Sequence, residues 1–289
     1  MALILVCNFL SLLKKVKNLN NFFDKNQFVN LICRDDKIGL VHKKIAKIIL
    51  KSKLPFLFKS NNLIFKENKK KKLNLTLENI CDLLIKKKFI KMATGEKFPC
   101  VLSLGRKEYF VLDRALVEYL GIRGYGVHMI AFVKKKKKIK IWIPLRAKNK
   151  RVEPNKLDNT VAGGIAAGES VYEALKRESA EEASLDKNIL KNAFQSGSIN
   201  YCWRNKDFSI RRDTLFIYDL ELSENIIPKN TDGELDNFKL YDSEKVISKI
   251  QNTNDFKKNC ALVLASFFIR RGMINSKNEK NYEEVCRHL

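Results

Sequence analysis

The sequence predicts an α/β protein in which a mixed β-sheet lies between helical layers, preceded by a smaller α+β segment. Three observations support this fold class. From residue 127 onward, apolar runs of strand length alternate with a few segments of helical periodicity. A glycine-rich turn leads directly into an acidic helix within residues 163 to 185. The first 120 residues instead alternate short apolar segments with connections rich in lysine and asparagine. Strands that alternate with helices are typical of a sheet covered by helices.

We expect an accessory domain over residues 1–120 and a second domain over residues 121–289. A chain of 289 residues is long enough for two domains of ordinary size. Glycines at positions 121, 124 and 126 punctuate the sequence at the expected boundary. The first part carries no recognisable chemistry. The segments in it with helical character are 9–19, 40–51, 76–90 and Arg114–Leu120.

The second part begins with a predicted β-hairpin. The apolar runs HMIAFV and IKIWIPL flank five consecutive lysines at 134 to 138, which would form a charged tip. Further along the chain, the residues Asp158-Asn159-Thr160 precede a short strand that approaches the acidic helix. The remaining predicted strands are 195–203, 213–222 and 237–241, and the remaining predicted helices are 243–251 and 258–271.

The acidic helix is the main candidate for chemistry. Positions three and four apart are neighbours on a helix, so Glu178, Glu181 and Glu182 share one face. Clustered carboxylates favour a bound cation, and their hard oxygens suit Mg²⁺, with Mn²⁺ as a second choice. Magnesium commonly shares its coordination between a few carboxylates and the phosphates of a substrate. The pattern therefore favours metal-assisted chemistry on a diphosphate over a merely solvated acidic face.

The turn before the helix is the second candidate feature. Gly163, Gly164 and Gly168 permit backbone conformations that side chains forbid, so main-chain groups of the turn can approach a ligand closely. Glu169 and Ser170 favour the start of the helix. We expect Gly163 and Gly164 to contribute to ligand binding together with Glu169 and the arginine of the helix, Arg177.

The spacing of these residues resembles the signature of the Nudix hydrolases. In order along the chain, the matching positions are Gly163, Glu169 after five residues, Arg177 and Glu178 after seven more, then Glu181 and Glu182. Two positions depart, with Ser179 in place of an aliphatic residue and Ser184 in place of glycine. The resemblance implies a Nudix α/β/α sandwich in which Glu178, Glu181 and Glu182 hold metal, Arg177 keeps them in register and Glu169 supports the junction of loop and helix.

A wider resemblance covers residues 125 to 274. Segments such as GYGVHMIAFV, LDNTVAGGIAAGES and FKKNCALVLASFFIRRG are similar to the Nudix branch that has an extra N-terminal domain and is associated with thiamine pyrophosphokinase. This likeness implies hydrolysis of damaged thiamine diphosphates, such as oxo and oxy forms, to monophosphates. It also implies that Glu234, in a loop far from the helix, supplies an additional metal ligand or base. We expect the N-terminal domain to shape the substrate pocket.

Several other residues have two interpretations. His128, in an apolar strand, is more consistent with a hydrogen-bonded core histidine than with a substrate contact. Trp142 is expected to pack in the core, with stacking on a heterocycle of a ligand as the alternative. Arg146 could meet phosphates or remain an exposed cation. Asp158 and Asn159 resemble a family motif, although a turn explains them equally well.

Other functions remain open at this point. A general nucleoside-diphosphate-linked pyrophosphatase or an isoprenoid-diphosphate enzyme could use the same helix. The net charge of +24 also allows an RNA-binding module whose acidic helix is vestigial. However, the lysine runs at 69–72 and 134–138 lack interleaved aromatic or arginine residues, so we interpret them as solvated loops and do not expect nucleic acid as a partner. The expected partner is a small-molecule diphosphate, and the sequence does not predict an oligomeric state.

The cysteines and apolar stretches bear on location. The seven cysteines are scattered and show no paired spacing, which favours neither a zinc site nor a disulfide framework. The apolar stretch at 2–13 lacks a preceding basic region, and the run at 260–269 is too short to cross a bilayer. We therefore expect a cytoplasmic protein with no membrane segment.

Overall fold

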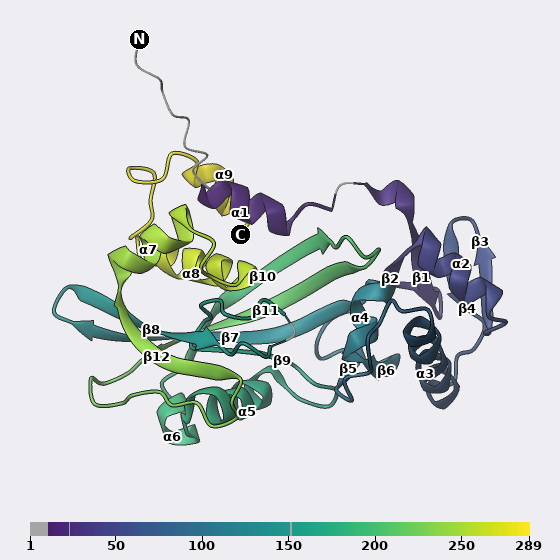
Figure 1. Cartoon of the computed structure of the whole chain (residues 1–289), viewed down its shortest axis with the longest axis horizontal. Coiled ribbons are helices and arrows are strands. Elements are labelled where there is room, and N and C mark those ends of the chain that lie inside the picture. Colours follow the sequence, from purple (N-terminus) through teal and green to yellow (C-terminus); the bar gives the residue numbers. More distant parts are fainter. Residues whose placement is uncertain (1–10, 23, 151) are drawn as a thin grey trace, which may run out of the picture.

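A computed structural model describes residues 11–22, 24–150 and 152–289 of the chain. Figure 1 shows two parts side by side along the longest axis, the first with the four strands β1 to β4 and the second around a larger sheet. The elements of the first part are α1 (Leu12–Leu19), the short 3-10 helix η1 (Lys25–Gln27), β1 (Phe28–Cys33), β2 (Asp36–His42), α2 (Lys43–Lys51), β3 (Phe56–Lys59), β4 (Asn62–Phe65), α3 (Lys70–Lys86), β5 (Lys97–Cys100), β6 (Phe110–Asp113) and α4 (Arg114–Leu120).

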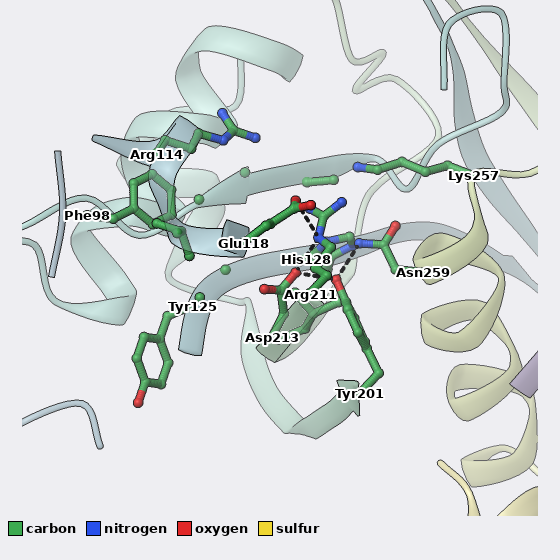
Figure 2. A pocket seen from close by; sticks show the side chains of 17 residues that line it. Phe98, Arg114, Glu118, Tyr125, His128, Tyr201, Arg211, Asp213, Lys257 and Asn259 are labelled. Carbon is green, nitrogen blue, oxygen red and sulfur yellow. Dashed lines mark hydrogen bonds and ion pairs between the residues drawn. The ribbon is translucent and has the colours of Figure 1, made fainter. Parts of the chain in front are cut away.

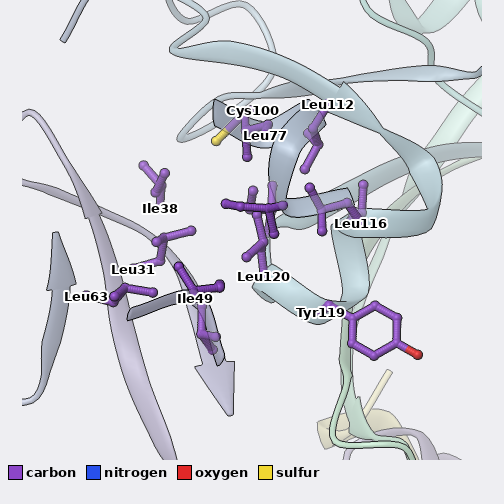
Figure 3. Packing of buried hydrophobic residues seen from close by; sticks show 14 of the residues in the cluster. Leu31, Ile38, Ile49, Leu63, Leu77, Cys100, Leu112, Leu116, Tyr119 and Leu120 are labelled. Atoms are coloured by element: carbon purple, nitrogen blue, oxygen red, sulfur yellow. The ribbon is translucent and has the colours of Figure 1, made fainter. Parts of the chain in front are cut away.

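The first part is α+β, as the sequence predicts. Its four-stranded sheet has the order β2-β1-β4-β3, and β5 and β6 form a separate hairpin. Apolar residues from the sheet, α2, α3 and α4 meet in one buried cluster, part of which Figure 3 shows around Leu31, Leu77 and Leu116. This cluster is large enough to give the first part a hydrophobic core of its own.

Two predicted helices in the first part have wrong limits. Residues 40–42 belong to β2, and α2 begins at Lys43, where the Nδ1 atom of His42 accepts a hydrogen bond from the Lys44 N–H at 3.1 Å. The helix expected at 76–90 is α3, which begins at Lys70 and ends at Lys86. The lysines at 70–72 therefore form the first turn of a helix and not a loop, because buried leucines and isoleucine at helical spacing continue directly after them. Helix α1 matches the end of the expected helix at 9–19, whose first two residues lie outside the described part of the chain.

The second part is an α/β/α sandwich, as expected. Its mixed sheet has the order β10-β11-β7-β8-β12, with β9 also paired to β7, and β11 and β7 run parallel while the other pairs are antiparallel. Helices α5 and α6 lie below the sheet in Figure 1, and α7 and α8 lie above it. The elements are β7 (Arg123–Lys135), β8 (Lys138–Arg146), β9 (Val161–Gly164), α5 (Val171–Ala183), α6 (Lys187–Leu190), β10 (Phe194–Arg204), β11 (Ile210–Glu221), β12 (Leu235–Asp242), α7 (Ser243–Asn252), α8 (Lys258–Arg270) and α9 (Tyr282–Arg287).

The predicted hairpin, the later strands and the two longer C-terminal helices are confirmed within a few residues. Strands β7 and β8 pair up to Lys135 and Lys138, so the lysine run forms the tip of the hairpin. The sheet buries apolar side chains on both faces, with one cluster under α7 and α8 and another under α5. Two covered faces are what a sandwich requires.

The two parts of the chain are connected by more than the covalent link. Leu12, Val16 and Leu19 of α1 are buried in the cluster that includes α8, so this N-terminal helix completes the core of the second part. Figure 1 also shows α1 beside α9. A second contact joins the end of β10 to α4. The side-chain amide of Asn205, the residue after β10, donates a hydrogen bond to Glu118 Oε2 at 2.8 Å. These contacts fix the parts against each other.

Two absences can be stated for the described residues. None of the helices in the described ranges is both long and apolar enough to span a membrane. The six cysteines that the structure describes are free thiols, in line with the expectation of no disulfide framework, and Cys7 lies outside the described residues.

Candidate functional site

Helix α5 begins with a reciprocal cap that places the acidic residues. The Ser170 hydroxyl accepts a hydrogen bond from the Glu173 N–H at 3.2 Å, and the Glu173 carboxylate accepts one from the Ser170 N–H at 2.8 Å. This capping box fixes where the helix starts. Glu169 therefore stands immediately before the first turn, facing the side chains that follow two turns later.

Arg177 collects the acidic residues around one guanidinium. Its Nε and Nη2 atoms donate to the two oxygens of Glu169 at 2.6 and 2.9 Å. Its Nη1 atom donates to Glu178 Oε1 at 2.8 Å and to Glu181 Oε2 at 3.3 Å. Nη2 also donates to the Gly164 carbonyl at 3.0 Å. The hydrogen bond from Arg177 holds the pKa of Glu169 below its usual range. The structure thus brings the arginine and three of the five predicted glutamates into one network.

Glu182 is buried and the Glu178 side chain is 13% exposed, so these two are the least accessible members of the acidic set. Glu182 is 3% exposed, and its Oε2 atom accepts a hydrogen bond from the Ala162 N–H at 2.7 Å. Burial raises the pKa of Glu182 well above its usual range, and the carboxylate of Glu178 raises it further. Burial also raises the pKa of Glu178, although Arg177 opposes this. Two poorly solvated carboxylates at one place are stabilised when a positive charge binds beside them.

Gly163 and Gly164 lie in strand β9 and not in a turn, which corrects the expectation from the sequence. The left-handed conformation in this region belongs to Gly168, with φ of +89°. Gly163 is needed for space instead, since a Cβ atom there would lie 1.8 Å from the Cδ atom of Glu178. At Gly164 a Cβ atom would lie 2.6 Å from the ring of Phe98. The two glycines thus allow the Glu178 carboxylate and an aromatic ring to approach the strand.

Glu234 lies near the acidic helix although it is distant in sequence. It precedes β12, and the charge of its carboxylate contributes to the raised pKa of Glu178. Glu234 forms an ion pair with Lys150 and its side chain is 48% exposed. The neighbouring Asp232 accepts a hydrogen bond from the Glu234 N–H at 2.7 Å, which is a turn role. Glu234 is thus close to the site and held by a surface lysine.

Arg177, Glu178, Glu181 and Glu234 line a groove with a volume of about 280 Å³. Glu178, Glu181 and Glu234 contribute acidic groups to it, and Arg114, Lys150, Arg211 and Lys257 contribute basic groups. Arg114 comes from the first part of the chain. The groove can therefore receive an anionic ligand and a metal ion together.

The donor set fits a hard divalent cation. Among the described residues, no three acidic, histidine or cysteine side chains converge on one point, because the Arg177 guanidinium stands between Glu178 and Glu181. The oxygens themselves are of the kind that Mg²⁺ or Mn²⁺ prefers. The raised pKa values of Glu178 and Glu182 show that a positive charge beside them would stabilise both carboxylates. Glu178, Glu181 and Glu182 are the residues that would hold such an ion.

A buried charged cluster lies behind the groove. Asp158 is 1% exposed and accepts a hydrogen bond from Arg146 Nη1 at 2.5 Å, while Lys257 Nζ lies 3.6 Å from it. Burial alone would raise the pKa of Asp158, but Lys257 and Arg146 together hold it well below the usual range. Arg146 also donates to two backbone carbonyls and is 5% exposed, so it is not an exposed cation, and it is one of the residues that line the groove. The resemblance of Asp158 to a family motif was the only sequence signal for this cluster.

His128 and Trp142 are both buried, as expected, and His128 is hydrogen-bonded. His128 is 3% exposed, and its Nδ1 atom lies 2.8 Å from the amide nitrogen of Asn159. Burial lowers the pKa of His128 to about 3, so the ring is neutral at physiological pH. Trp142 is buried in the cluster under α5. The sequence missed the polar group near His128, in which Arg211, Asp213, Tyr201 and Asn259 meet (Figure 2), because its members come from β10, β11 and α8.

Comparison with known proteins decides the family. A model of the NUDIX domain matches residues 123–261. Nudix hydrolase 20, chloroplastic, of Arabidopsis thaliana is 32% identical over 279 residues, which cover 92% of this chain and 74% of that protein. The chain belongs to the Nudix hydrolases. This Nudix hydrolase is therefore an enzyme of the pyrophosphohydrolase type.

Two further relatives extend the match beyond the Nudix domain. Nudix hydrolase 24, chloroplastic, of Arabidopsis thaliana is 30% identical over 282 residues, covering 96% of this chain and 77% of that protein. An uncharacterized protein of Saccharomyces cerevisiae is 35% identical over 231 residues, covering 73% and 67% of the two chains. Residues 9–124 match a domain of unknown function, DUF4743. The N-terminal part is thus shared with these relatives of the Nudix hydrolase.

Proposed function

We propose that this Nudix hydrolase removes the terminal phosphate of a damaged thiamine diphosphate, such as an oxo or oxy form, and leaves the monophosphate. The supporting observation for diphosphate chemistry is the position of Glu178 and the buried Glu182 on one helix face beside a groove that also holds basic groups, with the pKa values of both carboxyls raised by burial. The thiamine assignment rests on the resemblance of residues 125 to 274 to that branch. A small-molecule diphosphate fits the groove, which offers acidic groups for metal and basic groups for phosphate.

Each proposed residue has a distinct role. Bound Mg²⁺, or Mn²⁺ in its place, would neutralise the diphosphate and lower the pKa of the attacking water. Glu178, Glu181 and Glu182 would hold this metal, and Arg177 would keep Glu178 and Glu181 in register through its present hydrogen bonds. Glu169 orients Arg177 through two hydrogen bonds.

Glu234 is proposed as an additional ligand or base. It lines the same groove as Glu178, and its ion pair with Lys150 is at the surface, where such pairs contribute little stability. Exchange of this partner for a metal or a water molecule would therefore cost little. Gly163 and Gly164 are proposed to bind ligand through the space and the backbone atoms that they expose beside Glu178.

The division into an accessory domain at residues 1–120 and a catalytic domain at 121–289 is part of this proposal. Phe98 and Arg114 of the first part line the groove, which supports a role of the N-terminal domain in the substrate pocket. A cytoplasmic location is also retained as a proposal. The names of both plant relatives place those proteins in chloroplasts.

The test is phosphate release from a panel of diphosphates with Mg²⁺, by wild type and by the variant Glu182→Gln. The panel contains thiamine diphosphate, oxothiamine diphosphate, a nucleotide sugar and geranyl diphosphate. We expect oxothiamine diphosphate to be the preferred substrate, and Glu182→Gln to lower kcat at least about a hundredfold. The control is Glu244→Gln, an exposed glutamate in the first turn of α7.

Three results would contradict the proposal. Undiminished Mg²⁺-dependent turnover by Glu182→Gln would reject the metal assignment. Preference for the nucleotide sugar or for geranyl diphosphate would reject the thiamine assignment. Salt-sensitive retention of RNA without any phosphate release would instead favour the binding module with a vestigial helix.

A further inference from the structure

A recess lies beside the groove, between the two parts of the chain (Figure 2). Its volume is about 80 Å³. Phe98 and Glu118 from the first part and Tyr201 and Asp213 from the second part line it. Phe98, Arg114, Arg211 and Lys257 line both the recess and the groove of the glutamates. The two spaces therefore adjoin, and a ligand whose phosphates lie in the groove can extend into the recess.

Arg211 is held at the recess with part of its hydrogen-bonding capacity unused. Its Nε atom donates to Asp213 Oδ2 at 2.8 Å and lies 3.6 Å from Glu118 Oε1. The Tyr201 hydroxyl donates to the same oxygen of Asp213 at 2.6 Å. Within the described residues, neither Nη atom of Arg211 donates a hydrogen bond, and its side chain is 18% exposed. The guanidinium is thus oriented by fixed carboxylates and still has donors for a ligand.

Lys257 adds a second directed donor. Figure 2 shows its side chain reaching toward the centre of the recess from the start of α8. The side chain is 10% exposed, and it forms an ion pair with Asp158 at 3.6 Å. A ligand with hydrogen-bond acceptors would stabilise both of these largely covered cations, since unsatisfied polar groups in such a recess are costly.

Phe98 provides the apolar wall on the other side. It lies on β5 of the first part, is 8% exposed, and its ring would contact any Cβ atom at Gly164. The Arg114 guanidinium lies 5.7 Å from the centre of this ring. A flat group between Phe98 and Arg211 would meet carbon on one side and hydrogen-bond donors on the other.

We propose that this recess binds one ring of the organic half of the substrate and that Arg211 and Phe98 select a small ring with hydrogen-bond acceptors. This rests on the proposed function, because it assumes that the diphosphate lies in the adjoining groove. The size limits the entering part to one ring. An isoprenoid chain is disfavoured because it would cover the remaining donors of Arg211 and Lys257 without giving them acceptors.

The experiment compares three diphosphates that differ in the organic half. The organic half of oxothiamine diphosphate carries a ring with hydrogen-bond acceptors. That of geranyl diphosphate is an apolar chain, and that of methyl diphosphate is a single methyl group. The measured quantity is the ratio of kcat/KM for oxothiamine diphosphate to kcat/KM for methyl diphosphate. We expect Arg211→Gln and Phe98→Leu each to lower this ratio about tenfold or more, mainly through KM, because a hydrogen bond to a charged group or a packed wall is lost.

The matched control is Arg212→Gln. Arg212 follows Arg211 on β11 and therefore points to the opposite face of the sheet, where its Nη1 atom donates to the Gly121 carbonyl at 2.9 Å. This variant should leave the ratio unchanged. Since Arg211 supports Asp213, thermal unfolding of each variant is measured first, and Phe98→Leu tests the recess independently if Arg211→Gln does not fold.

A second readout does not depend on turnover. Trp203 is one of two tryptophans in the chain, and the Arg211 guanidinium lies 5.3 Å from the centre of its ring. Oxothiamine monophosphate added without metal should change the fluorescence of Trp203, with about a tenfold weaker Kd in Arg211→Gln.

The two proposals fail in different ways. If wild type hydrolyses none of the diphosphates, the proposed substrate is wrong. If wild type hydrolyses oxothiamine diphosphate but the folded variants keep the ratio and the Kd of wild type, the recess is not the ring subsite. A wild-type preference for geranyl diphosphate over oxothiamine diphosphate would overturn the inference as well.

Discussion

Acidification should weaken the fold through His128. The imidazole is buried in β7, and burial lowers its pKa from 6.5 to about 3, with a further contribution from the charge of Lys257. The unfolded chain takes up a proton on this residue below pH 6.5, whereas the folded chain does not until about pH 3. The stability that neutral His128 contributes is therefore present above pH 6.5 and is lost as the pH falls toward 3.

The magnitude follows from the two pKa values. Each pH unit below 6.5 costs about 1.4 kcal/mol of unfolding free energy until the folded form also protonates. Between pH 7 and pH 5 the loss is about 2 kcal/mol, and over the whole interval down to pH 3 it approaches about 5 kcal/mol. The smaller interval is the useful one, since many carboxylates begin to titrate below pH 5.

The assay is urea unfolding of wild type and His128→Gln at pH 7, 6 and 5 in the presence of a chelator. Glutamine can contact Asn159 through its amide and does not titrate. The altered packing should give the two proteins different free energies of unfolding at every pH, and only the change of this difference with pH is informative. Wild type should lose about 2 kcal/mol more than the variant between pH 7 and pH 5. Parallel pH profiles for the two proteins would refute the reasoning.

Three further changes have defined outcomes. Gly163→Ala places a methyl group in the volume of the Glu178 carboxylate, so Mg²⁺-dependent phosphate release should fall more than about tenfold with little loss of secondary structure; retained activity would mean that Glu178 is dispensable. Ser179→Ala removes a buried hydroxyl with no partner among the described residues and should raise the unfolding free energy by about 1 kcal/mol, whereas a decrease would indicate a partner such as water. Asp219→Ala leaves two arginines at the end of α8 without their fully buried carboxylate, and urea unfolding should show a loss of about 3–5 kcal/mol; a loss below about 1 kcal/mol would contradict this.

The sequence predicted those parts of the fold in which one local pattern dominates. The β7–β8 hairpin was predictable because a lysine run separates two long apolar stretches. The four-stranded sheet of the first part was not, because its strands are short and a short apolar run satisfies helical and strand periodicity equally. Residues 40–42 illustrate this, since they continue the apolar pattern of α2 backward but pair with β1.

The candidate site divides in the same way. Glu178, Glu181 and Glu182 lie on one helix, so their common face follows from their spacing. The ion pair between Glu118 and Arg211 does not follow from sequence spacing, because α4 and β11 approach each other only when the two parts of the chain fold together. The space that Gly163 leaves for Glu178 is likewise a tertiary contact, and the sequence supplied the right residue with the wrong reason.

The packing of α1 determines how the role of the first part can be tested. Deleting residues 1–120 would remove Arg114 and Phe98 from the substrate groove, which is the intended effect. The same deletion would remove Leu12 and Val16 and uncover the apolar side chains of α8 that they now bury. Lost activity in such a fragment would then follow from an exposed core as well as from an altered pocket. Point variants in β5 and α4 avoid this ambiguity, because they change the lining of the groove and leave α1 in place.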